Sequence, residues 1–421
     1  MQNVVRMMAA GLIGLSSLSF VSCGGGGSGG ASVVSTPAPT NVASVVVDAG
    51  PNNNSVNTLF TSVTVCVPGS TTECQTIDHI QVDTGSYGLR LLASVLTLSL
   101  PVTAASNGTL VECTQFVDGY SWGPVALADM QVAGETASSV PIQVIGSPAF
   151  ATVPASCSAT GPAEDTVAAF GANGILGIGV FEQDCGPVCA PSTTVDNSAN
   201  GYYFSCPAAA ACVGTAVALN SQVLNPIPLF ATDNDGSIID LPSVAAPGAT
   251  TLTGSLIFGI DTQSNNASGS ETILGLDPSN GDFTTVFNSQ TLTQSFLDSG
   301  TNGTFFDDSN LTPCPPPAQS TDPSFLGFYC PASSQSLTAT LTGTNNTSIP
   351  ETFTVDNAQT LATNNPTFSV LPTLAGTFST VANSNSGNTF DWGLPFFYGR
   401  RVATAIENQR TAVGTGPYVA F

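Results

Sequence analysis

Two five-residue segments of this chain have the same pattern. Residues 82–86 read Val-Asp-Thr-Gly-Ser, and residues 297–301 read Leu-Asp-Ser-Gly-Thr. Each is followed by a glycine at nearly the same distance: Gly177 lies 94 residues after Asp83, and Gly393 lies 95 residues after Asp298. A phenylalanine follows each of these glycines by four positions. One Asp-Thr-Gly is an ordinary turn sequence, so the repeated spacing carries the information, and it indicates a duplicated fold.

The two aspartates predict acid–base chemistry if the duplication brings them together. Two carboxylates held close together do not both ionise, so one keeps its proton while the other acts as a base. Such a pair can activate a water molecule and protonate a substrate. The hydroxyl residues of the two motifs can orient the carboxylates, and the glycines let backbone N–H groups approach them. The supporting residues predicted in this way are Thr84, Gly85, Ser86, Ser299, Gly300 and Thr301.

The pattern of the chain predicts a mostly β protein. Short apolar runs alternate with turns rich in Gly, Asn and Pro, and no long stretch has helical periodicity. The length of 421 residues is sufficient for two lobes, each with its own core, and 42% of the residues are hydrophobic.

From about Val45 to Phe421, the chain resembles the pepsin-like bilobal aspartic proteases. Besides the two Asp motifs, the resemblance rests on residues 173–179 (Asn-Gly-Ile-Leu-Gly-Ile-Gly), 254–261, 393–402 and 416–421. It implies a two-lobed pepsin-like acid-protease β-barrel fold with a pseudo-twofold internal repeat. It also implies that Asp83 and Asp298 form a catalytic dyad, that no cofactor is needed, and that the substrate is an extended peptide or protein. The expected lobes are residues 44–225 and 226–421.

The same resemblance implies a β-hairpin that covers the cleft and carries a tyrosine. The candidate hairpin spans residues 116–123. In one register Phe116 takes the tyrosine position without its hydroxyl; in a shifted register Tyr120 or Trp122 takes it. Arg90 lies where the family favours a tryptophan. It could pair with Asp118 of the hairpin, lower the pKa of the dyad, or form a surface ion pair.

The charge composition excludes several partner classes. The chain has no lysine, five arginines and one histidine, and its formal net charge is −23. Nucleic acid and anionic membrane surfaces are therefore poor partners. A metal site built from several histidines is not available, and no metal is expected. The single His79 is expected to be structural.

The N-terminal segment predicts export. Residues 1–23 have a positive charge at Arg6 followed by an apolar stretch, and they resemble a bacterial lipoprotein signal peptide in which Cys23 becomes the lipidated N-terminus. Residues 24–43 then read as a flexible Gly/Ser/Pro tether. The expected location is outside the cytoplasm, facing the periplasm or the cell surface, and this lipid anchor is the one membrane contact expected.

The ten cysteines that remain after Cys23 are an even number, which suggests disulfides in an exported protein. The sequence does not determine their connectivity. The simplest arrangement pairs neighbours: 66–74, 113–157, 185–189, 206–212 and 314–330.

Two functions are consistent with these observations. The first is a lipid-anchored aspartic endopeptidase, in which water activated by the Asp dyad hydrolyses peptide bonds. The second is a catalytically inactive envelope lipoprotein of the same fold that binds a peptide or a glycan. A structural envelope protein without a cleft would not need the paired motifs.

Overall fold

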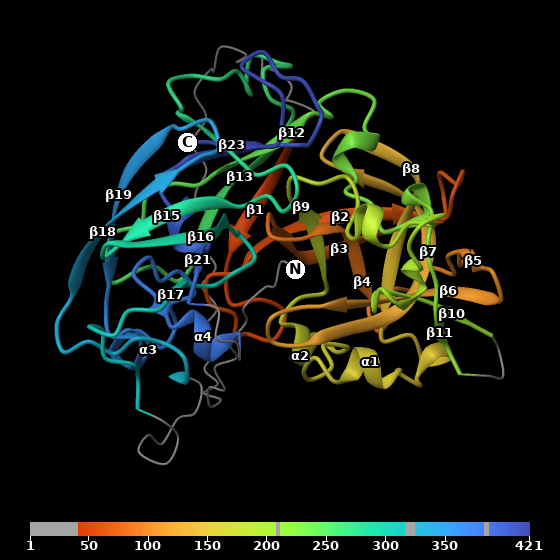
Figure 1. Ribbon diagram of the computed structural model, residues 1–421, viewed down its shortest axis with the longest axis horizontal. Coiled ribbons are helices and arrows are strands. Elements are labelled where there is room, and N and C mark those ends of the chain that lie inside the picture. Colours follow the sequence, from red (N-terminus) through yellow and green to blue (C-terminus); the bar gives the residue numbers. More distant parts are fainter. Residues whose placement is uncertain (1–40, 208–210, 316–324, 383–386) are drawn as a thin grey trace, which may run out of the picture.

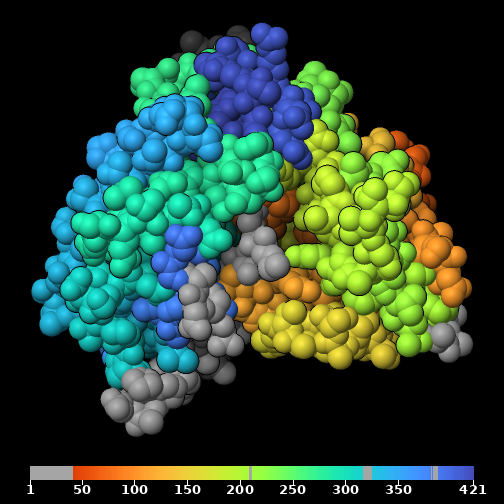
Figure 2. All heavy atoms as spheres, viewed as in Figure 1, coloured from red at the N-terminus to blue at the C-terminus, as the bar shows by residue number. Residues whose placement is uncertain are grey.

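The computed structural model describes residues 41–207, 211–315, 325–382 and 387–421 (Figure 1). The predicted signal peptide, Cys23 and residues 24–40 of the tether lie outside these ranges. The described chain is dominated by strands. Its N-terminal and C-terminal halves form two separate masses, with orange to yellow-green residues on one side and teal to blue residues on the other (Figure 2). The expected mostly β, two-lobed fold is confirmed.

The strands of the N-terminal half are mostly short, and their β-branched residues alternate between buried and partly exposed positions, as in β1. They are β1 (Val42–Val47), β2 (Leu59–Cys66), β3 (Cys74–Asp83), β4 (Tyr87–Leu92), β5 (Ala104–Ala105), β6 (Gly108–Gln115), β7 (Tyr120–Val132), β8 (Glu135–Ile145), β9 (Gly174–Ile178), β10 (Tyr203–Cys206) and β11 (Val213–Gly214).

The C-terminal half continues with β12 (Gly236–Asp240), β13 (Leu252–Phe258), β14 (Ile273–Gly275), β15 (Phe283–Phe287), β16 (Gln290–Leu297), β17 (Thr304–Phe306), β18 (Gln335–Thr342), β19 (Ser348–Val355), β20 (Ala375–Gly376), β21 (Thr389–Trp392), β22 (Arg401–Ala405) and β23 (Tyr418–Ala420). The α-helices are short: α1 (Ala155–Ser158), α2 (Val167–Phe170), α3 (Ala358–Asn364) and α4 (Phe378–Val381). No helix in the described part of the chain is long and apolar enough to cross a membrane.

One large sheet joins the two halves. Its order is β11-β10-β6-β7-β8-β4-β9-β3-β2-β1-β13-β12-β22-β23-β14. The first strand, β1, pairs antiparallel with β13, so that Val42 lies opposite Ile257. The last strand, β23, pairs with β22 and β14. A second sheet, with the order β19-β18-β15-β16-β21-β17-β20, belongs to the C-terminal half.

The internal repeat is visible in how the strands connect. In the N-terminal lobe β9 lies between β3, its parallel partner, and β4, its antiparallel partner. In the C-terminal lobe β21 lies between β16, parallel, and β17, antiparallel. A further parallel neighbour completes each set, β8 beside β4 and β20 beside β17. Both lobes therefore insert a late strand beside the strand that leads into the Asp motif.

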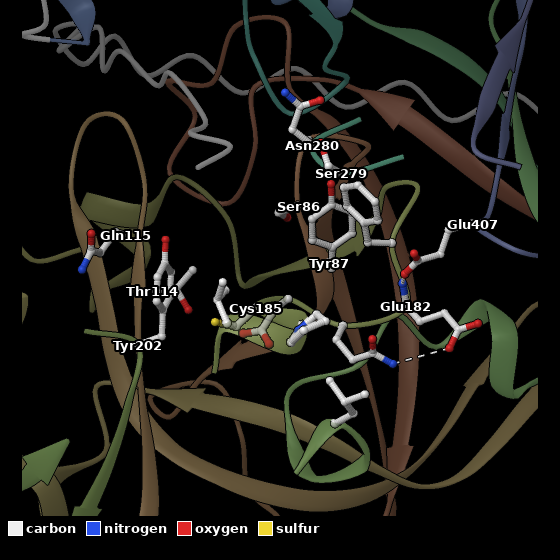
Figure 3. A pocket seen from close by; sticks show the side chains of 18 of the residues that line it. Ser86, Tyr87, Thr114, Gln115, Glu182, Cys185, Tyr202, Ser279, Asn280 and Glu407 are labelled. Atoms are coloured by element: carbon white, nitrogen blue, oxygen red, sulfur yellow. Dashed lines mark hydrogen bonds between the residues drawn. The ribbon is translucent and has the colours of Figure 1, made fainter. Parts of the chain in front are cut away.

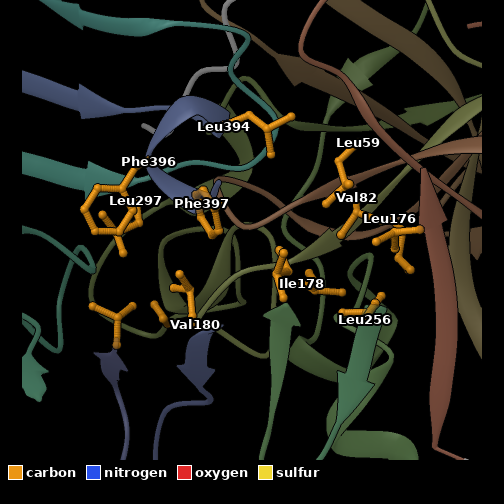
Figure 4. Packing of buried hydrophobic residues seen from close by; sticks show 14 of the residues in the cluster. Leu59, Val82, Leu176, Ile178, Val180, Leu256, Leu297, Leu394, Phe396 and Phe397 are labelled. Atoms are coloured by element: carbon orange, nitrogen blue, oxygen red, sulfur yellow. The ribbon is translucent and has the colours of Figure 1, made fainter. Parts of the chain in front are cut away.

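A continuous apolar core lies behind the two motifs. Val82 and Leu176 of the N-terminal lobe belong to the same buried cluster as Leu297 and Leu394 of the C-terminal lobe (Figure 4). Within the C-terminal lobe the core is aromatic: the ring of Phe390 stacks on that of Trp392 with 4.3 Å between centroids. This shared core fixes the position of each motif relative to the other.

Asn57 connects the lobes through a fully satisfied side chain. Its Nδ2 donates to the carbonyl oxygens of Asn302 and Leu371, both at 2.8 Å. Its Oδ1 accepts from the Leu371 N–H at 2.7 Å and from the Tyr398 hydroxyl at 2.8 Å. Asn57 is completely buried, so these four bonds use the whole capacity of its amide inside the protein.

Five disulfides close local loops, and they are the five neighbouring pairs expected from the sequence: 66–74, 113–157, 185–189, 206–212 and 314–330. Disulfides of this number are typical of proteins that fold outside the reducing cytosol. They support an extracellular or periplasmic location.

A pair of buried acids lies where the β7–β8 hairpin meets the segment before β12. The side chain of Glu135 is hydrogen-bonded to that of Asp233, and burial together with this neighbour raises the pKa of Glu135 to about 7. Asp233 in turn accepts hydrogen bonds from Thr262 and Gln263. The proton of the pair therefore resides on Glu135 below neutral pH.

We expect this pair to make the protein less stable as the pH rises. Because the folded-state pKa of Glu135 lies above the usual 4.5, its contribution is fully present below about pH 4.5 and is lost as the pH approaches 7. Glu135→Gln keeps a donor toward Asp233, so its free energy of unfolding should depend less on pH between 5 and 8 than that of the wild type. Urea unfolding at several pH values measures this. Glu73→Gln, at an exposed acid, is the control. The expectation would be contradicted if the free energy of unfolding depended on pH equally in both variants.

Candidate active site

The two aspartates lie at equivalent places in the repeat. Asp83 is the last residue of β3 and lies opposite Gly177 of β9. Asp298 follows β16, whose last residue, Leu297, lies opposite Trp392 of β21. The Asp298 N–H donates to the Trp392 carbonyl at 3.0 Å. The matched sequence spacings therefore correspond to matched strand registers.

Each carboxylate accepts the same kinds of hydrogen bond. Oδ1 of Asp83 accepts from the Gly85 N–H at 2.7 Å, and Oδ1 of Asp298 accepts from the Gly300 N–H at 2.8 Å. Oδ2 of Asp83 accepts from the Ser86 hydroxyl, and Oδ2 of Asp298 accepts from the Thr301 hydroxyl at 3.0 Å. One glycine N–H and one hydroxyl therefore hold each carboxylate in the same way.

The two carboxyl groups contact each other. Their side chains are hydrogen-bonded, and both are completely buried. Burial holds the pKa of Asp298 well above its usual range, and negative charge on the neighbouring Asp83 or Asp391 would raise it further. A hydrogen bond between two buried carboxyl groups requires one shared proton, so the pair contains one acid and one base.

Reciprocal hydrogen bonds behind the carboxylates connect the motifs. The Thr84 N–H donates to Ser299 Oγ at 3.1 Å, and the Ser299 N–H donates to Thr84 Oγ1 at 2.9 Å. The two hydroxyls donate onward, Thr84 to the Leu297 carbonyl at 3.0 Å and Ser299 to the Val82 carbonyl at 2.9 Å. Each motif is therefore held by the backbone of the other lobe.

Arg90 forms neither of the two ion pairs considered from the sequence. It does not pair with Asp118, and it is not a surface residue, because its side chain is 1% exposed. Its Nη2 donates to Glu112 Oε1 at 2.7 Å and to Asp184 Oδ2 at 3.2 Å. The reason is that every residue of β4 is buried, so this arginine lies inside the lobe and its charge is neutralised there.

A cavity of about 840 Å³ lies beside the Asp83 motif (Figure 3). Ser86 and Tyr87 line it from the N-terminal lobe, and Ser279 and Asn280 line it from the C-terminal lobe. Arg90 and the disulfide-bonded Cys185 also contribute to its wall. The cavity therefore opens between the lobes, against Gly85 and Ser86 of the Asp83 motif.

The β6–β7 hairpin contributes Phe116 to this cavity. The turn of the hairpin is closed by a 2.8 Å hydrogen bond from the Phe116 N–H to the Gly119 carbonyl. Among the described residues, Phe116 lines the cavity, whereas Tyr120 and Asp118 do not. Tyr120 instead packs in an apolar cluster with Trp122 and the 113–157 disulfide. Of the three aromatic residues considered for the tyrosine position, Phe116 is therefore the one that lines this cavity.

Several residues of the site were missed by sequence reasoning. Gln81 donates from Nε2 to the Gly300 carbonyl at 2.7 Å, and Glu112 and Asp184 neutralise Arg90. Asp391, a third buried acid, interacts with the aspartate pair. The signal available for Asp391 was its position in the repeat, where the N-terminal lobe has Ile175. No cluster suited to a metal ion is found in the described ranges.

Comparison with known proteins gives a family without an assigned function. Residues 37–421 match a family described as a protein of unknown function, DUF3443. The chain belongs to this family. No curated protein matches it. Among solved structures it is similar to an aspartic proteinase from Irpex lacteus, with a TM-score of 0.47, 16% identity, and coverage of 90% of this chain and 96% of the proteinase.

We expect Gly300→Ala to disrupt the aspartate pair. A Cβ at Gly300 would overlap the Asp83 carboxylate, and one at Gly85 would overlap that of Asp298. Because the site is rigid and buried, the substitution should cost about 2 kcal/mol of stability. Denaturant unfolding measures this. Gly414→Ala is the matched control, since the nearest atom to its Cβ would be 3.9 Å away; equal stability of the two variants would contradict the geometry.

Proposed function

We propose that this protein is an exported, lipid-anchored aspartic endopeptidase. The observation that carries the proposal is the hydrogen-bonded pair of Asp83 and Asp298, each held by one backbone N–H and one hydroxyl. The cavity beside the Asp83 motif, lined by both lobes, supports a substrate bound between the lobes.

The proposed reaction uses water as the nucleophile. The ionised carboxylate removes a proton from a water molecule as it attacks the peptide carbonyl, and the protonated carboxyl hydrogen-bonds the carbonyl oxygen. The leaving amine then takes a proton from the pair. No covalent intermediate forms, and the chain's own residues supply both the acid and the base.

The substrate class is an extended peptide. The β6–β7 hairpin presents Phe116 on one side of the cavity, and residues 279 and 280 face it from the other lobe. An extended chain between them could bond to the backbone as an added strand. Because Phe116 has no hydroxyl, the hairpin holds the substrate through apolar contact rather than through a hydrogen bond.

We expect Asp83→Asn and Asp298→Asn each to abolish cleavage while the fold is retained, because Asn keeps the shape of Asp but cannot share a proton. Digestion of a peptide library from acidic to neutral pH, with peptides identified by mass spectrometry, measures this. Asp78→Asn, an exposed acid in the same strand as Asp83, is the control. Cleavage that persists in the double variant Asp83→Asn, Asp298→Asn would place the activity elsewhere. A wild type that binds peptides without cleaving them would identify the binding protein instead.

The membrane anchor is a second element of the proposal. We expect the mature protein to begin at a diacylated Cys23, and Cys23→Ser to release it from the membrane fraction. Mass spectrometry of the mature N-terminus checks this. An unmodified N-terminus upstream of Cys23, or a Cys23→Ser variant that stays in the membrane fraction, would contradict it.

A further inference from the structure

Asp391 is an acid in an apolar position of the C-terminal lobe. It lies in β21, and its register partners are Phe296 of β16 and Phe305 of β17. Directly paired residues of neighbouring strands share a face of the sheet, so Asp391 lies between two phenylalanines. Its side chain is completely buried. The equivalent residue of the N-terminal repeat is Ile175, which shows that the fold itself does not need an acid here.

Among the residues that the structure describes, none provides a counter-charge for Asp391. The ionisable groups that interact with it are Asp83 and Asp298, both acids. Burial holds the pKa of Asp391 well above its usual range and Asp83 raises it; a hydrogen bond donated by the Thr301 hydroxyl would lower it, but that hydrogen is directed to Asp298. Neither carboxyl oxygen makes a hydrogen bond of ordinary geometry, and the polar group beside it is the Thr301 hydroxyl. A buried carboxyl in such a place is stable only in its neutral form.

The hydroxyl of Thr301 determines which of the two groups, Thr301 or Asp391, can donate a hydrogen bond to the other. A threonine hydroxyl has a single hydrogen to donate. Thr301 donates that hydrogen to Asp298 Oδ2 at 3.0 Å. Toward Asp391 it can therefore only accept. The loop that carries Thr301 is also hydrogen-bonded to the turn after β21, because the Leu394 N–H donates to the Thr301 carbonyl at 2.7 Å.

We propose that Asp391 is a positioning residue that remains protonated and donates to Thr301, so that Thr301 directs its own hydrogen to Asp298. The resulting chain runs from Asp391 through Thr301 to Asp298, and it has no counterpart on the Asp83 side, where Ile175 replaces the acid and Ser86 is the donor. A donor that is itself hydrogen-bonded is more strongly polarised. Asp391 thereby stabilises the ionised form of the pair and makes its two sides unequal.

The proposal deepens the proposed function, because it concerns the same pair, but its test needs no substrate. Protein labelled with ¹³C at the aspartate carboxyls is titrated by NMR, and the Asp391 signal is assigned by its loss in Asp391→Asn. In the wild type Asp391 should stay protonated through neutral pH, because burial disfavours its charged form. In Asp391→Ile the apparent pKa of the Asp83–Asp298 pair should rise by about half a unit to one unit, a three- to tenfold tighter hold on the proton. Asp391→Asn, which keeps a donor toward Thr301, should restore the wild-type value.

Two outcomes would overturn the proposal. The first is an Asp391 signal that titrates below neutral pH, since an ionised Asp391 cannot donate. The second is a folded Asp391→Ile variant whose pair titrates as in the wild type. Both can be observed even if the protein cleaves no peptide, so failure of the proposed function does not obscure them. If peptides are cleaved, the acid limb of the pH profile should move with the pKa of the pair in Asp391→Ile and not in Asp391→Asn.

Discussion

The reciprocal hydrogen bonds between Thr84 and Ser299 are the constraint on which the rest of the site depends. Each residue donates from its backbone to the other's hydroxyl, and each hydroxyl donates to a backbone carbonyl of the other lobe. All four groups are buried, so separating the lobes here would leave several polar groups without partners. The carboxylates one residue earlier in each motif are thus held together although like charges oppose their approach. Gln81 and Asn57 add further bonds between the lobes on either side.

A chain without lysine must stabilise its buried acids in other ways. Arg90 serves two of them, Glu112 and Asp184, and these two acids are also hydrogen-bonded to each other. Glu135 with Asp233 and Asp83 with Asp298 form further acid pairs. In the pairs Glu135–Asp233 and Asp83–Asp298 a shared proton takes the place of a cation. The candidate active site is therefore one of several pairs of buried carboxyl groups in the described part of the molecule.

The sequence was most informative where local backbone rules decide the structure. The 94- and 95-residue spacings predicted equivalent places for Gly177 and Gly393. In each lobe the strand that leads to the glycine runs parallel to the strand that leads into the Asp motif, so nearly equal spacings give the same register. The disulfides followed from pairing neighbours in sequence. The partners of Arg90 could not be read in this way, since Glu112 and Asp184 reach it only through the folding of separate strands. The role of Asp391 could not be predicted for a related reason. It depends on which face of β21 lies against Thr301, and residue type alone does not show that.

The path of the shared sheet also determines when the protein can become complete. β1, the first strand described, pairs with β13 more than two hundred residues later, and β23 lies at the very end of the chain. Long-range pairings of this kind form late and slowly. During synthesis the N-terminal lobe has neither its neighbour strand β13 nor Ser299 to hold its motif. The aspartate pair therefore cannot assemble until the segment that carries Asp298 and Ser299 has been synthesised and has met the N-terminal lobe.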